Sequence, residues 1–258
     1  MKNKKGQIFV IVAVVLLGLM FVSFEILTMI EQRQEVKTRI STMESFLFSI
    51  EENLQRQMFI VGFRTIFLAE TEITSSGNYI SDIDHFFQEA FYNGTVNGEE
   101  KEILIGATYQ EIIDSINDKA KKVSVEVSFN NTILEVRQDD PWNVKVIMRS
   151  DFTMQDKSNL AKWRKTQEII ALVPINGFED PVYLINTNGQ VPNKINQTPY
   201  QTFISGNNTS NLLSHVTNSY YTHSTLAPNF LDRLEENFSA DSNGIESLVY
   251  LPELTTQG

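Results

Sequence analysis

The residues best suited to metal binding or acid–base chemistry fall in three short acidic clusters. The first is "SDIDHF", which holds Asp82, Asp84 and His85. On a helix, Asp82 and His85 would share a face and could ligate a metal. The same pattern is also typical of a solvated, capped first helical turn, and we favour that interpretation.

The other two clusters are the carboxylate pairs Asp139–Asp140 in "RQDDP" and Glu179–Asp180 in "FEDP". Paired carboxylates serve glycosidases and calcium sites, but neither pair has the spacing of a calcium loop. Aspartate before proline favours turns for local reasons. The chain also has no G-x-S-x-G, no phosphate-binding glycine loop, no H-E-x-x-H and no Rossmann fingerprint. We therefore expect no enzyme activity, no metal and no cofactor, and an extracellular hydrolase on a stalk is the least favoured alternative.

Composition limits the classes of protein further. The 258 residues are 41% hydrophobic with a net charge of −11, and cysteine is absent. The lack of cysteine excludes disulfides, thiolate metal sites and cysteine nucleophiles. No basic patch is visible in the sequence, so we expect no nucleic-acid partner.

These residues must be positioned by elements that begin with a long apolar stretch. No charged residue occurs from Gln7 to Phe24, and only Glu25 interrupts the apolar run that continues to Ile30. About 20 apolar residues suffice to cross a membrane as a helix. We predict a transmembrane helix at residues 7–30. Because Lys2, Lys4 and Lys5 precede it, we expect a single-pass protein of the cell membrane with a cytoplasmic N-terminus and an extracellular C-terminal domain.

The apolar run is too long for an ordinary secretory signal, and no A-x-A cleavage pattern follows it. "KKGQ" before a hydrophobic helix resembles the class III signal of archaeal type IV pilin-like proteins. The resemblance implies a leader at residues 1–6, cut between Gly6 and Gln7 by a prepilin peptidase. Bacterial members carry glutamate at the fifth mature position, where this chain has Ile11.

The resemblance also implies partners: membrane lipid, the prepilin peptidase, a pilus assembly ATPase with its membrane platform, and other pilin-like subunits or copies of the chain itself through the N-terminal helix. The alternative is an uncleaved membrane anchor that begins with lysines.

Residues 31–74 extend the anchor as an amphipathic helix. The segment has no proline, and its only glycine is Gly62. Apolar residues recur at a 4-3 spacing that predicts a seam along one helix face. The seam residues are Val36, Ile40, Met43, Leu47, Ile50, Leu54 and Val61, with Gln57 in the missing slot. Two interpretations are open, since this face could pack on the chain's own domain or on other copies.

Residues 75–186 are expected to form the exported domain, with an antiparallel sheet of about four strands at about 122–175. Ser75–Asn78 should end the long helix. A short helix capped by Ser81 and closed by Asn93–Gly94 should follow, and then a helix with Ile112, Ile113 and Ile116 on one face. Alternation from Val123 onward predicts the strands, with tight turns at Asn130–Asn131 and at "DDPW". We predict an α+β fold, which is the architecture that the resemblance to type IV pilin-like proteins implies.

Residues 187–258 are expected to be a loop-rich C-terminal region that is cut short. Within it, residues 187–211 should form a long exposed loop, residues 230–238 a short helix, and "GIESLVYLPEL" a last strand. Six N-x-S/T sequons lie beyond the long helix, where glycans would be attached on an exported face. The acceptor residues would be Asn93, Asn130, Asn196, Asn207, Asn208 and Asn237.

The hypothesis from sequence is a non-enzymatic, membrane-anchored, pilin-like subunit of the archaeal cell surface. It would be a structural or minor component of a type IV pilus-like filament, or of a secretion or adhesion assembly. The alternative is an uncleaved single-pass surface protein whose acidic ectodomain binds a ligand and does not assemble.

Overall fold

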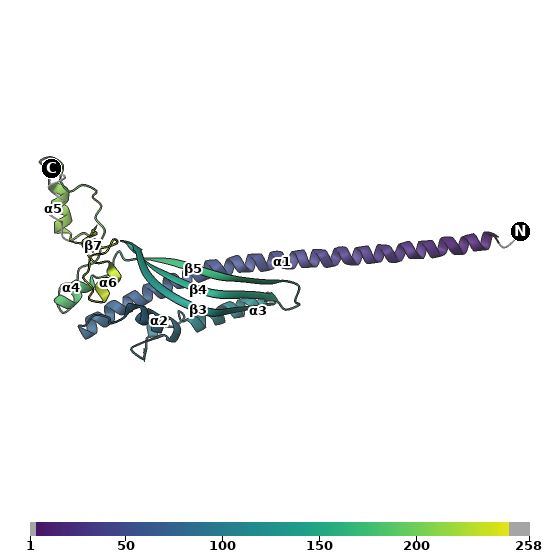
Figure 1. The fold of residues 1–258 in the computed structure, drawn as a ribbon, viewed down its shortest axis with the longest axis horizontal. Coiled ribbons are helices and arrows are strands. Elements are labelled where there is room, and N and C mark those ends of the chain that lie inside the picture. Colours follow the sequence, from purple (N-terminus) through teal and green to yellow (C-terminus); the bar gives the residue numbers. More distant parts are fainter. Residues whose placement is uncertain (1–3, 248–258) are drawn as a thin grey trace.

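The computed structural model describes residues 4–247 as an α+β molecule from which one long helix extends (Figure 1). In chain order the elements are α1 (Lys4–Ser76), α2 (Ile83–Asn93), β1 (Thr95–Val96), β2 (Glu99–Glu100), the 3-10 helix η1 (Glu102–Leu104), α3 (Tyr109–Lys122), β3 (Val125–Asp140), β4 (Asn143–Asp156), β5 (Lys162–Pro174), α4 (Pro181–Asn186), α5 (Ser210–Thr217), β6 (Thr222–His223), α6 (Phe230–Leu234) and β7 (Ile245–Glu246).

Helix α1 runs without a break for 73 residues, which corresponds to about 110 Å. The prediction of one continuous helix is confirmed. It ends at Gly77, which takes the left-handed conformation (φ 70°) and donates its N–H to the carbonyl of Ile73 at 2.9 Å. Glycine tolerates this conformation without steric strain, so the predicted stop at Ser75–Asn78 has a clear cause.

The second half of α1 packs on the chain's own sheet, chiefly on β5 and β4. Of the predicted seam, Met43, Ile50, Leu54 and Val61 are at most 3% exposed. From Met43 onward, the seam therefore packs on the chain's own domain, which is the first of the two interpretations.

Gly62 lies where α1 approaches the sheet most closely. A Cβ atom at this position would lie 2.7 Å from Val146 Cγ2 and 2.8 Å from Val173 Cγ2. Real Cβ contacts are longer than this, so the missing side chain lets the helix backbone reach β4 and β5.

The sheet is a three-stranded antiparallel meander in the order β3-β4-β5. Helices α1, α2 and α3 cover one face, and the other face is open to solvent (Figure 1). Buried residues therefore alternate with polar ones along the strands, as a half-exposed antiparallel sheet requires. The predicted sheet location is confirmed.

The predicted hairpin turn at Asn130–Asn131 is wrong, and the main sheet has three strands instead of about four. Both halves of β3 pair with β4, through Asn130↔Asp151 and Ile133↔Arg149, with a register shift between them. Asn131 takes φ 51° and forms a β-bulge, which uses the same left-handed tolerance of asparagine that a turn would use. Thr132 Oγ1 lies 2.9 Å from Ser150 Oγ and 2.9 Å from Tyr109 Oη, which holds the bulge in place.

The helices on the covered face begin at capping residues. Thr108 and Glu111 form a reciprocal capping box at the start of α3. The predicted cap at Ser81 is wrong by one residue, because Asp82 accepts the backbone N–H of His85 at 2.8 Å and caps α2. Gly94 closes α2 as predicted, with φ 69°.

The C-terminal region is more ordered than the sequence predicted. Helix α4 was not predicted, although Asp180 caps it and Pro181 occupies its first turn. The expected loop at 187–211 contains Ile195, which is fully buried, and its end enters α5. The predicted helix at 230–238 is shorter, and β7 covers only the first part of the predicted last strand, whose residues from 248 onward lie outside the described part of the chain.

Candidate functional site

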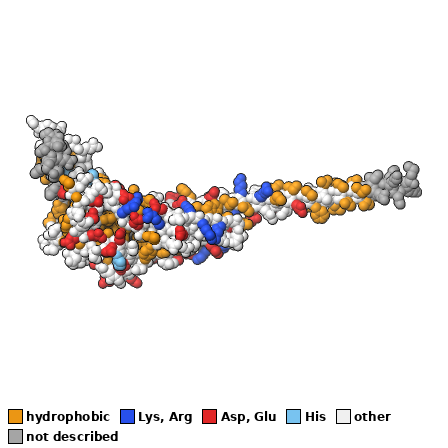
Figure 2. Space-filling view, viewed as in Figure 1, with side chains coloured by type: hydrophobic (Ala, Val, Ile, Leu, Met, Phe, Trp, Pro, Cys, Tyr) orange, Lys and Arg blue, Asp and Glu red, His pale blue; other side chains and the backbone are white. Residues whose placement is uncertain are grey.

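The most unusual surface of the molecule is the first part of α1, which the rest of the described chain leaves uncovered. Every large apolar side chain from Phe9 to Ile30 is 50–75% exposed. Figure 2 shows this segment as a rod of hydrophobic side chains that projects from the body. Soluble proteins rarely leave a continuous apolar surface of this size in water. The segment is long and apolar enough to cross a membrane.

Two hydroxyl groups within this segment are satisfied inside the helix. Ser23 Oγ donates to the carbonyl of Leu19 at 2.8 Å, and Thr28 Oγ1 donates to the carbonyl of Phe24 at 2.9 Å. Such bonds let a hydroxyl lie in hydrocarbon without an unpaired polar group. These two hydroxyl groups therefore meet the hydrogen-bonding demand of a bilayer, and the segment has the length to cross one.

The predicted cleavage residues, Gly6 and Gln7, lie in the first turn of α1. They precede the exposed apolar segment along the same unbroken helix. Cleavage between them would leave the whole segment attached to the domain.

Arg39 ties α1 to the near end of the sheet. Its Nε donates to Asp156 Oδ1, and its Nη2 donates to the carbonyls of Val123 at 2.7 Å and Ser124 at 2.6 Å. Burial raises the pKa of Asp156, but the hydrogen bonds from Arg39 and from the N–H groups of Ser158 and Leu160 outweigh burial, so that this pKa lies below its ordinary value. The folded protein thus stabilises the charged form of Asp156.

At the far end of α1, two carboxyl groups lie close together. Glu70 is 8% exposed and accepts the backbone N–H of Glu179 at 2.6 Å. The pKa of Glu70 is raised from 4.5 to about 8, chiefly by burial and also by the charge of Glu179, while the hydrogen bond from Glu179 N–H and the charge of Lys194 act to lower it. Glu70 therefore carries a proton near neutral pH. Among the described atoms, Glu179 Oε2 is buried without a hydrogen-bond partner.

A buried network holds the C-terminal region to α4. Asp180 Oδ2 accepts Arg233 Nη1 at 2.8 Å and the Tyr221 hydroxyl at 2.8 Å, and Asn193 Nδ2 donates to that hydroxyl at 2.9 Å. Burial and the Asp180 carboxylate raise the pKa of Tyr221. Breaking such a pair leaves an uncompensated buried charge, so these residues are structural anchors.

The other acidic residues considered from sequence serve local structure. Asp82 caps α2, and His85 contributes only its backbone N–H to that cap. Asp140 Oδ1 accepts Trp142 N–H at 2.8 Å within the predicted "DDPW" turn. Within residues 4–247, no three His, Asp or Glu side chains are grouped as metal ligands.

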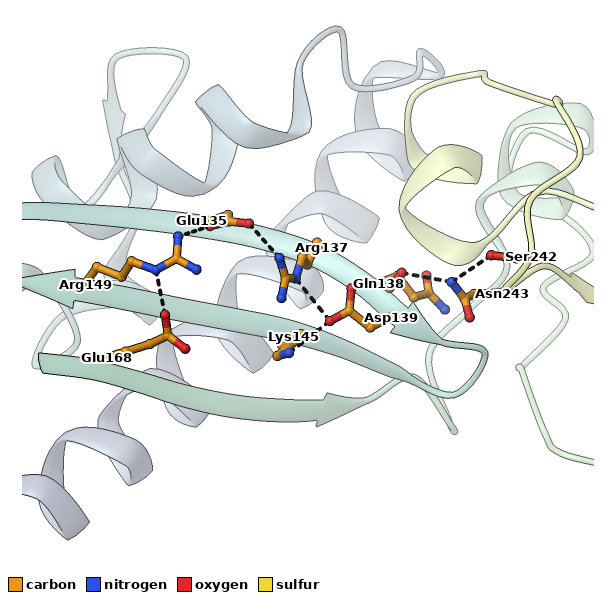
Figure 3. Close-up of polar contacts among 9 residues, drawn as sticks. All are labelled: Glu135, Arg137, Gln138, Asp139, Lys145, Arg149, Glu168, Ser242 and Asn243. Atoms are coloured by element: carbon orange, nitrogen blue, oxygen red, sulfur yellow. Dashed lines mark hydrogen bonds and ion pairs between the residues drawn. The ribbon is translucent and has the colours of Figure 1, made fainter.

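The solvent face of the sheet carries a balanced set of charges across three strands (Figure 3). Arg149 donates to Glu135 at 2.5 Å and to Glu168 at 2.6 Å. Asp139 accepts Arg137 at 3.1 Å and Lys145 at 2.9 Å. Arg137, Lys145 and Arg149 therefore each have a carboxylate beside them, and this part of the face presents little net charge.

Five of the six predicted glycan acceptors are exposed. The exposed residues are Asn93, Asn130, Asn207, Asn208 and Asn237. Asn196 is half-buried. The amide of Asn237 already donates to Asp232 Oδ1 at 2.8 Å, so attachment there would break that bond.

The comparisons with known proteins give no relative. No protein-family model, no curated protein and no solved structure matches this chain.

Proposed function

We propose that this chain is an exported, membrane-anchored, pilin-like subunit of a type IV pilus-like archaeal surface filament, or of a secretion or adhesion assembly. Its N-terminus would be cytoplasmic and its domain extracellular. The single observation that supports the proposal most is the exposed apolar segment of α1, which continues without a break into the part that packs on the domain.

A helix built in this way suits a subunit that moves from lipid into a filament. The domain covers only the second half of α1, so the first half needs an outside partner. Lipid chains or the same helix of neighbouring copies provide equivalent apolar surroundings. The folded domain would not have to rearrange during the transfer.

Cleavage is the chemical step that the proposal requires. A prepilin peptidase would cut the peptide bond between Gly6 and Gln7 and remove Lys2, Lys4 and Lys5. Loss of these charges lowers the barrier that holds the helix end at the cytoplasmic face. An assembly ATPase and its membrane platform would then act on the mature chain.

The test is intact mass and N-terminal sequencing of the protein from membranes of a host with a prepilin peptidase. We expect a mature chain that starts at Gln7, and we expect Gly6→Val to keep its leader. A wild-type protein that retains Lys2 would contradict the proposal. That result would favour an uncleaved single-pass surface protein whose ectodomain binds a ligand without assembly.

A further inference from the structure

A group of cations that form no salt bridge with the described residues lies beside α1 where the helix leaves the domain. We call this group the basic collar, and it consists of Lys37, Lys119, Lys122, Lys157, Lys162 and Arg164. All six side chains are exposed. None forms an ion pair with any residue in the described part of the chain.

The cations in the middle of the sheet's solvent face are paired with carboxylates. On the solvent face of the sheet, Arg137, Lys145 and Arg149 each contact at least one carboxylate (Figure 3). The β4–β5 tip, "KSNLAKWRK" from Lys157 to Lys165, has four cations and no carboxylate, although the whole chain has a net charge of −11. The β4–β5 tip is therefore a locally basic segment of an acidic protein.

Its position in the fold is set by Arg39. Because Arg39 binds Asp156 and the carbonyl of Ser124, the β4–β5 tip and the end of α3 lie level with this residue. Ile30, the last residue of the exposed apolar segment, lies nine residues earlier, or roughly 14 Å along the axis. In Figure 2, Lys and Arg side chains are prominent where the rod leaves the body.

These dimensions place the basic collar near a membrane surface. Lipid headgroups extend several ångströms beyond the hydrocarbon core, and a lysine side chain adds several more. The remaining gap is within the Debye length of about 8 Å at physiological salt. Leu160, which is 42% exposed at the β4–β5 tip, adds an apolar side chain among the cations.

We propose that the basic collar binds the anionic headgroups of the membrane that α1 spans. This inference rests on the proposed membrane anchoring. The contact would hold the domain against the bilayer until assembly removes the subunit from lipid. Each cation near an anionic surface shifts the contact equilibrium roughly fivefold, so a pair of lysines has a large effect.

The test uses the full chain in phosphatidylcholine vesicles with or without phosphatidylglycerol. Because the chain has no cysteine, Ser158→Cys provides one labelling site at the tip. Energy transfer from this label to a headgroup-labelled lipid reports tip–membrane contact. We expect transfer to rise with phosphatidylglycerol and to fall at about 1 M salt, where the Debye length is about 3 Å.

The variant Lys157→Gln with Lys162→Gln should lose most of the rise, by roughly tenfold or more in the contact equilibrium. The matched control, Lys101→Gln with Lys194→Gln, removes two distal lysines and should keep it. The inference would be overturned if energy transfer did not depend on phosphatidylglycerol, or if the tip substitutions left it unchanged. Transfer between labels on two copies, independent of phosphatidylglycerol, would also overturn it and would assign the basic collar to a neighbouring acidic subunit.

Failure of anchoring is distinguishable from failure of the collar. If the chain does not float with phosphatidylcholine vesicles, the proposed membrane anchoring is wrong. If it floats but its tip does not respond to phosphatidylglycerol, only the collar inference is wrong.

Discussion

Glu70 shows how a single residue can make the fold sensitive to pH. It is buried between α1 and the start of the C-terminal region, where it accepts the N–H of Glu179. Its pKa is raised from 4.5 to about 8, so the folded state binds a proton that the unfolded chain releases. The stabilisation from this proton is fully present below about pH 4.5 and is lost as the pH rises to about 8.

We predict that Glu70→Gln flattens the pH dependence of stability between pH 5 and 8. Glutamine keeps an acceptor for Glu179 N–H but does not titrate. Above pH 8 the variant should be more stable than the wild type by on the order of 2–4 kcal/mol. Denaturant unfolding in detergent at several pH values measures this. Glu44→Gln, an exposed site on the same helix, is the control, and equal curves for Glu70→Gln and the wild type would contradict the prediction.

At the level of elements, the packing of α1 on the sheet depends on Gly62. A Cβ there would overlap Val146 and Val173. We predict that Gly62→Val destabilises the domain by about 1–3 kcal/mol, because overpacking outweighs any change in helix propensity. Thermal unfolding would measure the loss. Restoration by Val146→Ala in the same chain would show that overlap is the cause, whereas an unchanged melting temperature for Gly62→Val would contradict the packing argument.

Some of these elements can be predicted from the sequence, and others cannot. Helix α1, the location of the antiparallel sheet and the end of α2 at Gly94 follow from periodicity and short motifs. The sequence predicts a turn at Asn130–Asn131 where the structure has a bulge, because both use left-handed asparagine, and only the pairing of both halves of β3 with β4 distinguishes them. The contact between Arg39 and Asp156 joins residues 117 apart in sequence, so no local pattern indicates it. Helix α4 had a local signal that was missed, the cap Asp180 followed by Pro181.

For the whole molecule, the exposed apolar segment of α1 is the property that determines where the chain can reside. We predict that Val15→Lys with Leu19→Lys prevents stable membrane integration. A lysine at the centre of a spanning helix costs about 2.5–3.5 kcal/mol. Carbonate extraction of membranes should release this variant. Thr38→Lys with Thr42→Lys, which adds the same charge to the exposed surface beyond the segment, should stay in the membrane pellet, and retention of both variants would contradict the prediction.

Because α1 is unbroken, it also fixes the rotational orientation of the domain about the membrane normal. Each residue of an α-helix turns the chain by about 100°. A single residue inserted between Ile30 and Arg39 would therefore rotate the β4–β5 tip by about 100° around the helix axis. It would move the tip only about 1.5 Å away from the membrane. Seven inserted residues would return the tip to nearly the same rotational orientation, about 10 Å farther from the membrane. The number of residues between the membrane and the domain thus determines both the rotational orientation of the domain and its distance from the membrane.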